Sequence, residues 1–268
     1  MSAEPSTERG GQYVDVAGLR TYYEVLGEGD PLVLLHGGLV TVETFDALTP
    51  ALAAKYKVYL PERRAHGRTP DVEGPITYEN MAQDTIAFLE ALGIESAHLA
   101  GWSDGALVAL IVALRRPERV RKLVYIGQNL TPDGVRPEAV PMLLGMTRET
   151  APPIFEQMYA AVSPDGPDHF GVVFDKITTM FKTDPGVAMS ELKGVEAPTL
   201  VLLGDDDLIS VEYGAEMQRT LPTAQLAVVP GASHALPMEK PDLVTRLILD
   251  FLSDEQVSKM MPITDHHG

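Results

Sequence analysis

The chain has 268 residues, no cysteine, and a formal net charge of −17 from 21 basic and 38 acidic side chains. Without cysteine it cannot form disulfides, thiol nucleophiles or thiolate metal sites, and its negative charge disfavours nucleic acid and anionic membranes as partners. No apolar run reaches the roughly 18 residues of a membrane span, and residues 1–10 do not resemble a secretory signal. These features predict one large cytoplasmic domain and leave its oligomeric state open.

Eight short runs read as strands, and most of them are apolar without alternation, which is typical of strands buried on both faces. They are Gln12–Val16, Leu19–Leu26, Pro31–His36, Lys57–Leu60, Ser96–Ala100, Val120–Ile126, Pro198–Leu203 and Gln225–Val229. Helical patterns lie between them at Val42–Ala54, Tyr78–Leu92, Asp104–Arg115, Val211–Leu221 and Asp242–Leu252. This alternation predicts an α/β fold, a mostly parallel eight-stranded sheet with helices on both faces. Ligands of such sheets bind beyond the carboxyl ends of the strands.

Residues 128–192 interrupt the alternation, because they are rich in proline, methionine and phenylalanine and contain no convincing strand. We expect a helical cap there, with residues 11–127 and 193–253 forming the core and residues 1–10 and 254–268 forming flexible termini. Flexible methionine side chains suit an adaptable apolar pocket, although the same residues could simply pack together. The cap residues predicted to bind substrate are Met142, Met146, Phe155, Met158 and Phe174.

The most informative segment is Gly101-Trp102-Ser103-Asp104-Gly105, which has the spacing G-x-S-x-G between a predicted strand and a predicted helix. A serine on such a sharp turn needs small neighbours where strand and helix nearly touch. The turn exposes its hydroxyl at the amino end of a helix, where N–H groups favour developing negative charge. Ser103 is therefore the candidate nucleophile.

A serine hydroxyl needs a base to take its proton and a third group to orient that base. His234 follows the last predicted strand, and Asp205, Asp206 and Asp207 follow the preceding one. Both positions lie at strand carboxyl ends, in the order Ser…Asp…His. His234 is therefore the candidate base, with its acid partner among the three aspartates.

A loop after the third strand, His36-Gly37-Gly38, can supply a backbone N–H to a developing oxyanion. We assign Gly38, with Leu39 as the alternative, and expect the N–H of Asp104 to be the second donor. Leu39 and Trp102 are also candidates for substrate contact, although Trp102 is expected to pack beneath the serine turn.

Together these segments resemble the α/β-hydrolase-fold serine hydrolases of the carboxylesterase and lactonase kind, over about Gln12 to Leu252. In that family the acid stands three residues after the glycine that ends its strand, which selects Asp207 and leaves Asp206 in reserve. Glu62–Thr69 resembles the family's D-x-R-G-x-G-x-S loop but departs from it at Glu62, Ala65 and Thr69. These departures put the pocket shape in question rather than the catalysis.

The resemblance implies hydrolysis of a small ester or lactone through an acyl-enzyme, without a metal or an organic cofactor. The acidic surface and the roomy cap favour a large cationic lactone, such as a macrolide bearing an amino sugar. A cofactor-free haloperoxidase or perhydrolase, a carbon–carbon bond hydrolase and a ligand receptor remain alternatives on the same scaffold.

Overall fold

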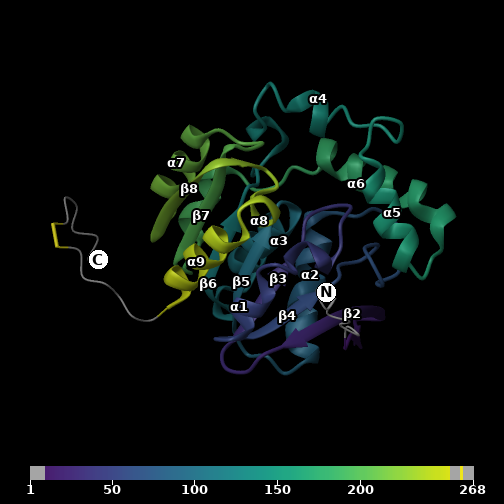
Figure 1. Cartoon of the computed structure of the whole chain (residues 1–268), viewed down its shortest axis with the longest axis horizontal. Helices are drawn as coiled ribbons and strands as arrows, with labels where there is room; N and C mark the ends of the chain where they lie inside the picture. Colours follow the sequence, from purple (N-terminus) through teal and green to yellow (C-terminus); the bar gives the residue numbers. More distant parts are fainter. Residues whose placement is uncertain (1–9, 254–259, 262–268) are drawn as a thin grey trace, which may run out of the picture.

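An eight-stranded sheet crosses the centre of the molecule in the computed structural model, which describes residues 10–253 and 260–261 (Figure 1). Its strands, in spatial order, are β1 (Gln12–Val16), β2 (Leu19–Leu26), β4 (Lys57–Pro61), β3 (Pro31–Leu35), β5 (Ala97–Trp102), β6 (Val120–Ile126), β7 (Thr199–Asp206) and β8 (Ala224–Ser233). Strands β3 to β8 are mutually parallel, while β1 and β2 pair antiparallel with their neighbours. The predicted mostly parallel sheet is confirmed. Of the termini predicted to be flexible, all but Gly10, Met260 and Met261 lie outside the described residues.

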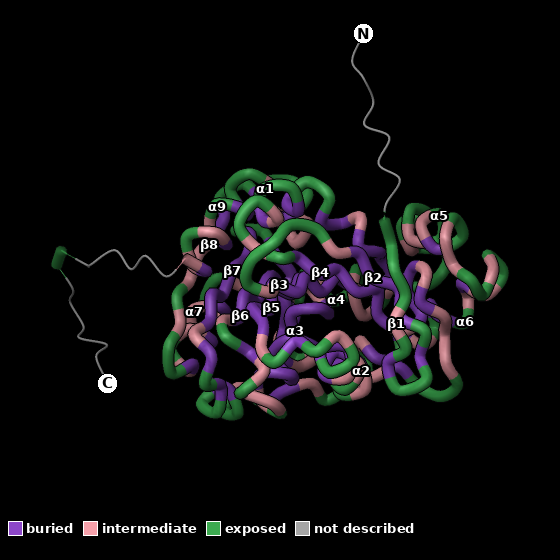
Figure 2. Tube along the Cα trace, turned by 90° about the horizontal axis from the view of Figure 1, so that it is seen from below, coloured by how far each residue is buried: buried purple, intermediate pink, exposed green. Residues whose placement is uncertain are grey.

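Helices cover both faces of the sheet, which is why its central strands are apolar without alternation. One face carries α2 (Tyr78–Ala91), α3 (Asp104–Arg115) and α7 (Val211–Thr220), and the other carries α1 (Thr49–Ala53), α8 (Leu236–Glu239) and α9 (Pro241–Leu252). Figure 2 shows α2 and α3 on one side of the strands and α1 and α9 on the other. All six residues of β5 are buried between these two layers.

Residues 128–192 form no strand, and they contribute helices that gather above one end of the sheet (Figure 1). These are α4 (Val140–Leu143), α5 (Pro153–Val162) and α6 (Phe170–Thr183), with 3₁₀ turns η3 (Pro132–Gly134), η4 (Pro167–His169) and η5 (Met189–Gly194). Helix α6 buries a stripe at three- and four-residue spacing that includes Phe170, Val173, Phe174 and Ile177, as expected of an amphipathic helix packed on a core.

Polar contacts with the segment Asp71–Val72 help to fasten these helices to the core. Lys176 of α6 bonds both carboxylate oxygens of Asp71, at 2.8 and 2.7 Å, and also the carbonyl of Val72. His169 reaches the same carboxylate at 2.9 Å. Because Asp71 belongs to the loop before α2, these bonds hold the cap in a defined position over the strand ends.

The largest differences from the expected elements are at Val42–Ala54, β7 and β8. The helix expected over Val42–Ala54 is split into η1 (Val42–Phe45) and α1, and Pro50 lies in the first turn of α1, where its missing N–H breaks no helical hydrogen bond. Strands β7 and β8 run further than expected, since a register shift after Gly204 lets Asp206 pair with Ser233. No described helix is long and apolar enough to cross a membrane.

Candidate active site

Ser103 occupies the turn between β5 and α3, with backbone angles of φ 55° and ψ −130°. A non-glycine residue with positive φ is strained, and the turn is held by a bond of 2.9 Å from the Ser103 N–H to the Ile126 carbonyl. A side chain at Gly101 would overlap the backbone of Gly105, and one at Gly105 would overlap that of Leu35. The small residues of the G-x-S-x-G segment are thus required by close backbone approach.

Ser103, His234 and Asp207 form one hydrogen-bonded chain. His234 Nε2 lies 2.9 Å from Ser103 Oγ, and His234 Nδ1 lies 2.8 Å from Asp207 Oδ1. The Asp207 side chain is fully buried, whereas that of Asp206 is 86% exposed and faces Arg136. The structure therefore brings Asp207, not Asp206, to the histidine. Since Nδ1 faces a carboxylate, the proton belongs on Nδ1, and Nε2 is left to accept from the serine hydroxyl.

Backbone and aromatic contacts hold this chain in place. The N–H groups of Gly204 and Leu208 donate to the Asp207 carboxylate at 3.1 and 2.7 Å. The indole N–H of Trp102 donates to the His234 carbonyl at 2.7 Å, and its buried ring lies beside the imidazole. Trp102 thus packs beneath the turn, as expected, while its predicted contact with substrate stays a prediction.

Gly127, directly after β6, is a site residue that the sequence analysis missed. A Cβ there would lie 2.8 Å from Asp207 Oδ2 and 3.3 Å from His234 Nδ1, and the residue has φ 61°. Only glycine suits both the close approach and the left-handed backbone. A glycine immediately after a buried strand was the available signal.

The loop after β3 lies close to Ser103. A Cβ on Gly37 would lie 3.2 Å from Ser103 Cβ. The Leu39 N–H already donates to His66 Nε2 at 3.1 Å, which favours Gly38 over Leu39 as the oxyanion donor. Asp104 begins α3, so its N–H has no acceptor within the helix. The oxyanion hole made by Gly38 and Asp104 stays a prediction that this arrangement favours.

The Asp104 side chain is buried next to Ser103. Its Oδ1 accepts from the Tyr78 hydroxyl at 2.8 Å and from Gln128 Nε2 at 3.4 Å. Its Oδ2 is buried and has no hydrogen-bond partner among residues 10–253 and 260–261. Burial raises the pKa of Asp104, while the Arg63 guanidinium opposes that rise. A side chain at Gly38 would overlap this carboxylate, so Oδ2 lies against the loop after β3.

A family model described as "Alpha/beta hydrolase family" matches residues 32–247, a span that contains all three members of the hydrogen-bonded chain. The chain belongs to this family.

Relatives of this α/β hydrolase act on different molecules, according to their descriptions. This chain is 29% identical over 255 residues to "Putative carbamate hydrolase RutD" of Azorhizobium caulinodans, and the match covers 87% of this chain and 95% of the relative. A meta-cleavage product hydrolase of Pseudomonas fluorescens is 25% identical with a TM-score of 0.77, covering 90% of this chain and 97% of that one. Est816, described as an N-acyl homoserine lactone degrading enzyme, is 26% identical with a TM-score of 0.73, covering 90% of this chain and all of that one.

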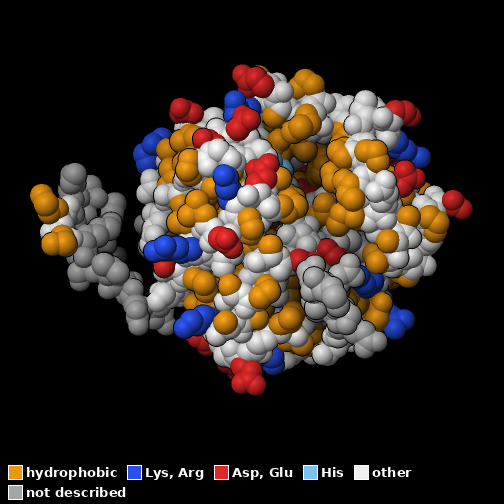
Figure 3. Space-filling view, viewed as in Figure 1, with side chains coloured by type: hydrophobic (Ala, Val, Ile, Leu, Met, Phe, Trp, Pro, Cys, Tyr) orange, Lys and Arg blue, Asp and Glu red, His pale blue; other side chains and the backbone are white. Residues whose placement is uncertain are grey.

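The cap of this α/β hydrolase reaches the loop after β3. A Cβ on Gly38 would lie 3.0 Å from the ring of Phe181 in α6, a contact that the sequence analysis did not single out. Figure 3 shows a hollow beside the cap, bordered by hydrophobic side chains, with a histidine visible inside it. An apolar wall around a few polar groups is the usual form of a small-molecule site.

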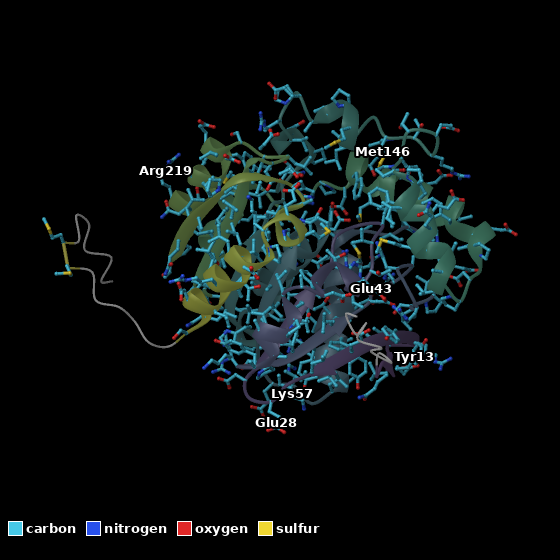
Figure 4. All side chains as sticks on the ribbon, in the orientation of Figure 1. Tyr13, Glu28, Glu43, Lys57, Met146 and Arg219 are labelled. Atoms are coloured by element: carbon cyan, nitrogen blue, oxygen red, sulfur yellow. The ribbon has the colours of Figure 1, made fainter. Side chains whose placement is uncertain are left out.

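The cap residues predicted to bind substrate have different surroundings. Met146 (labelled in Figure 4), Phe155 and Met158 are partly buried against the core, and Phe174 is only 2% exposed. Met142 is 64% exposed on α4. The short helix α4 has no buried residue. For all five residues, substrate contact stays a prediction.

The segment Glu62–Thr69 lies beside the loop after β3. The carboxylate of Glu62 accepts from Arg68 at 2.6 Å, and Arg68 also pairs with Glu43, labelled in Figure 4. The Thr69 hydroxyl donates to the Glu62 carbonyl at 2.8 Å. Two of the residues that depart from the family pattern, Glu62 and Thr69, thus bond to each other within the loop, in keeping with a structural role.

Proposed function

We propose that this α/β hydrolase cleaves carboxylic ester or lactone bonds through an acyl-enzyme on Ser103. The observation that carries the proposal is the continuous hydrogen-bonded chain from Ser103 Oγ through His234 to Asp207. His234 Nε2 takes the hydroxyl proton as Oγ attacks the carbonyl carbon, and Asp207 stabilises the imidazolium. The N–H groups of Gly38 and Asp104 bind the oxyanion, each contributing about 3–4 kcal/mol.

His234 then returns its proton to the leaving alcohol, which departs and leaves the acyl group on Ser103. A water molecule gives a proton to His234 Nε2 and attacks the acyl carbonyl, again through an oxyanion. Collapse releases the acid and restores the serine. In a lactone the leaving alcohol is part of the same molecule, so the product differs from the substrate by the mass of one water.

A substrate panel tests this function. Purified protein is incubated with simple esters, lactones, macrolides and a meta-cleavage product, and each reaction is followed by mass spectrometry. We expect multiple turnovers of simple esters, with lactone products heavier by one water. Turnover of the meta-cleavage product alone would favour the carbon–carbon hydrolase alternative, which similarity to such a hydrolase supports. Saturable binding with no turnover of any compound would favour a receptor.

The buried carboxylate of Asp104 beside Ser103 supports a substrate with a cation near the scissile carbonyl. In a low-dielectric site a carboxylate attracts a cation without direct contact, and this one lies against the loop after β3. A large lactone that carries an amino sugar has such a group and also suits the apolar cap. We extend the proposal to macrolides of this kind; the absence of a hydrolysed product from every macrolide in the panel would rule it out.

Asp104→Asn tests this substrate preference, since asparagine keeps the shape of the side chain and removes its charge. We expect kcat/KM for an amine-bearing ester to fall about 10- to 100-fold, because the attraction between the buried carboxylate and the substrate cation is lost. For a neutral ester of equal size we expect a change of less than about threefold. The measurement is the ratio of the two kcat/KM values. An unchanged ratio would show that Asp104 does not contribute to the preference for a charged over a neutral substrate.

A further inference from the structure

We propose that His36 and His66 are a reciprocal pair of positioning residues that, together with Arg63, hold the loop of residues 36–39 so that the Gly38 N–H faces the reacting carbonyl. The inference rests on the proposed function, because it concerns the oxyanion donor of that reaction. It assigns a role to two buried histidines that the proton-transfer chain does not use.

His66 provides one half of the pair. Its Nε2 accepts the Leu39 N–H at 3.1 Å, so that nitrogen carries no proton. The proton is therefore on Nδ1, which lies 2.9 Å from the Arg64 carbonyl and donates to it. Burial, with the Arg63 charge as a second cause, lowers the pKa of His66 to about 3. The ring is thus neutral at physiological pH and accepts a backbone N–H from the other loop.

His36 provides the other half in the opposite direction. Its Nε2 accepts the Arg63 N–H at 3.2 Å, and its Nδ1 lies 2.7 Å from the Gly37 carbonyl, to which it donates. The ring is fully buried, and its centre is 5.0 Å from that of His66. Each loop therefore contributes one imidazole, and each imidazole accepts a backbone N–H of the partner loop. Protonation would place a hydrogen on Nε2, which would then face a backbone N–H and could no longer accept a hydrogen bond from it. Both histidines must therefore stay neutral.

Arg63 holds the carbonyl groups of the loop of residues 36–39. Its buried guanidinium donates through Nη2 to the carbonyls of His36 at 2.6 Å and Gly37 at 2.8 Å. The peptide between Gly37 and Gly38 is trans, so its N–H points opposite to its carbonyl. Fixing the Gly37 carbonyl toward Arg63 and His36 therefore turns the Gly38 N–H away from them. Leu39 follows with φ 59°, a strained angle that the bond to His66 helps to hold.

Paired substitutions at His66 test the role. In His66→Leu the acceptor for the Leu39 N–H is lost, and in His66→Gln the side-chain oxygen can replace Nε2. We expect His66→Leu to lower kcat for p-nitrophenyl butyrate about 10- to 100-fold with KM within about threefold of wild type, since misplacing one donor weakens only transition-state binding. We expect His66→Gln to recover most of the loss. Affinity for a trifluoromethyl ketone, which forms a tetrahedral adduct on serine, should fall in parallel with kcat/KM.

His98→Leu is the matched control, because His98 is also a buried histidine but lies on β5 against Tyr56. It should lower the melting temperature without lowering kcat. If His66→Leu keeps the wild-type kcat, or if the glutamine and leucine variants lose activity equally, the inference is wrong.

A second measurement on the wild-type protein needs neither activity nor variants. Nitrogen-15 NMR of labelled histidines at pH 5 should show His36 and His66 neutral with the proton on Nδ1. A proton on Nε2 of either ring would overturn the inference. If the wild type cleaves no ester, the proposed function fails, while this spectrum still decides whether the paired histidines exist as described.

Discussion

Ser103→Ala is expected to lower kcat for p-nitrophenyl butyrate about 10⁴- to 10⁶-fold. The hydroxyl is the only group in the hydrogen-bonded chain that can form the acyl intermediate. Rapid mixing should show a burst of p-nitrophenol equal to the enzyme concentration in wild type if deacylation is the slower step, and no burst in the variant. Intact-protein mass spectrometry of the quenched wild-type reaction should show one added butyryl group.

The fold should survive this change, because alanine meets no additional clash at the turn and the Ser103 N–H keeps its bond to the Ile126 carbonyl. Ser96→Ala, just before the opposite end of β5, is the control and should retain wild-type kcat. Residual activity of Ser103→Ala within tenfold of wild type, with the melting temperature unchanged, would show that another residue is the nucleophile.

Asp207→Asn is expected to lower kcat about 10⁴-fold with little change in KM. The carboxylate accepts hydrogen bonds from Gly204, Leu208 and His234, and each of these three donors is an N–H group. An asparagine has one oxygen and one NH₂ group in place of the two oxygens, so its NH₂ must face at least one of these three N–H donors. The imidazole then loses the partner that keeps its proton on Nδ1 and stabilises its charged form.

Asp206→Asn is the matched control, since it makes the same chemical change one residue away on an exposed side chain. It should keep kcat within about twofold, as expected for a surface substitution. Steady-state kinetics of the two variants on one ester measure the difference. Loss of activity in Asp206→Asn with retention in Asp207→Asn would exchange the two assignments and contradict the observed geometry.

The strand ends explain why so much of the site was predictable. Ser103 follows β5, Gly38 lies in the loop after β3, and His234 follows β8, and parallel strands bring such ends to one edge of the sheet. The apolar runs that locate these ends are local patterns, so they can be recognised without knowing the fold. The choice among the aspartates at the end of β7 is different. The family resemblance favoured Asp207, but its contact with His234 depends on how the chain turns after the register shift beside Gly204.

The sequence by itself determined the α/β architecture, the serine turn and the placement of Ser103, the aspartates and His234 at strand ends, because hydrophobic periodicity and short-range spacing encode them. Only the tertiary structure decided which aspartate meets the histidine, that the Leu39 N–H is engaged by His66, and that Asp104 is buried with one unpartnered oxygen. The first two depend on single hydrogen bonds between residues 27 positions apart, Asp207 with His234 and Leu39 with His66. Such bonds leave no repeating pattern in the chain, because they need only one donor and one acceptor that folding brings together.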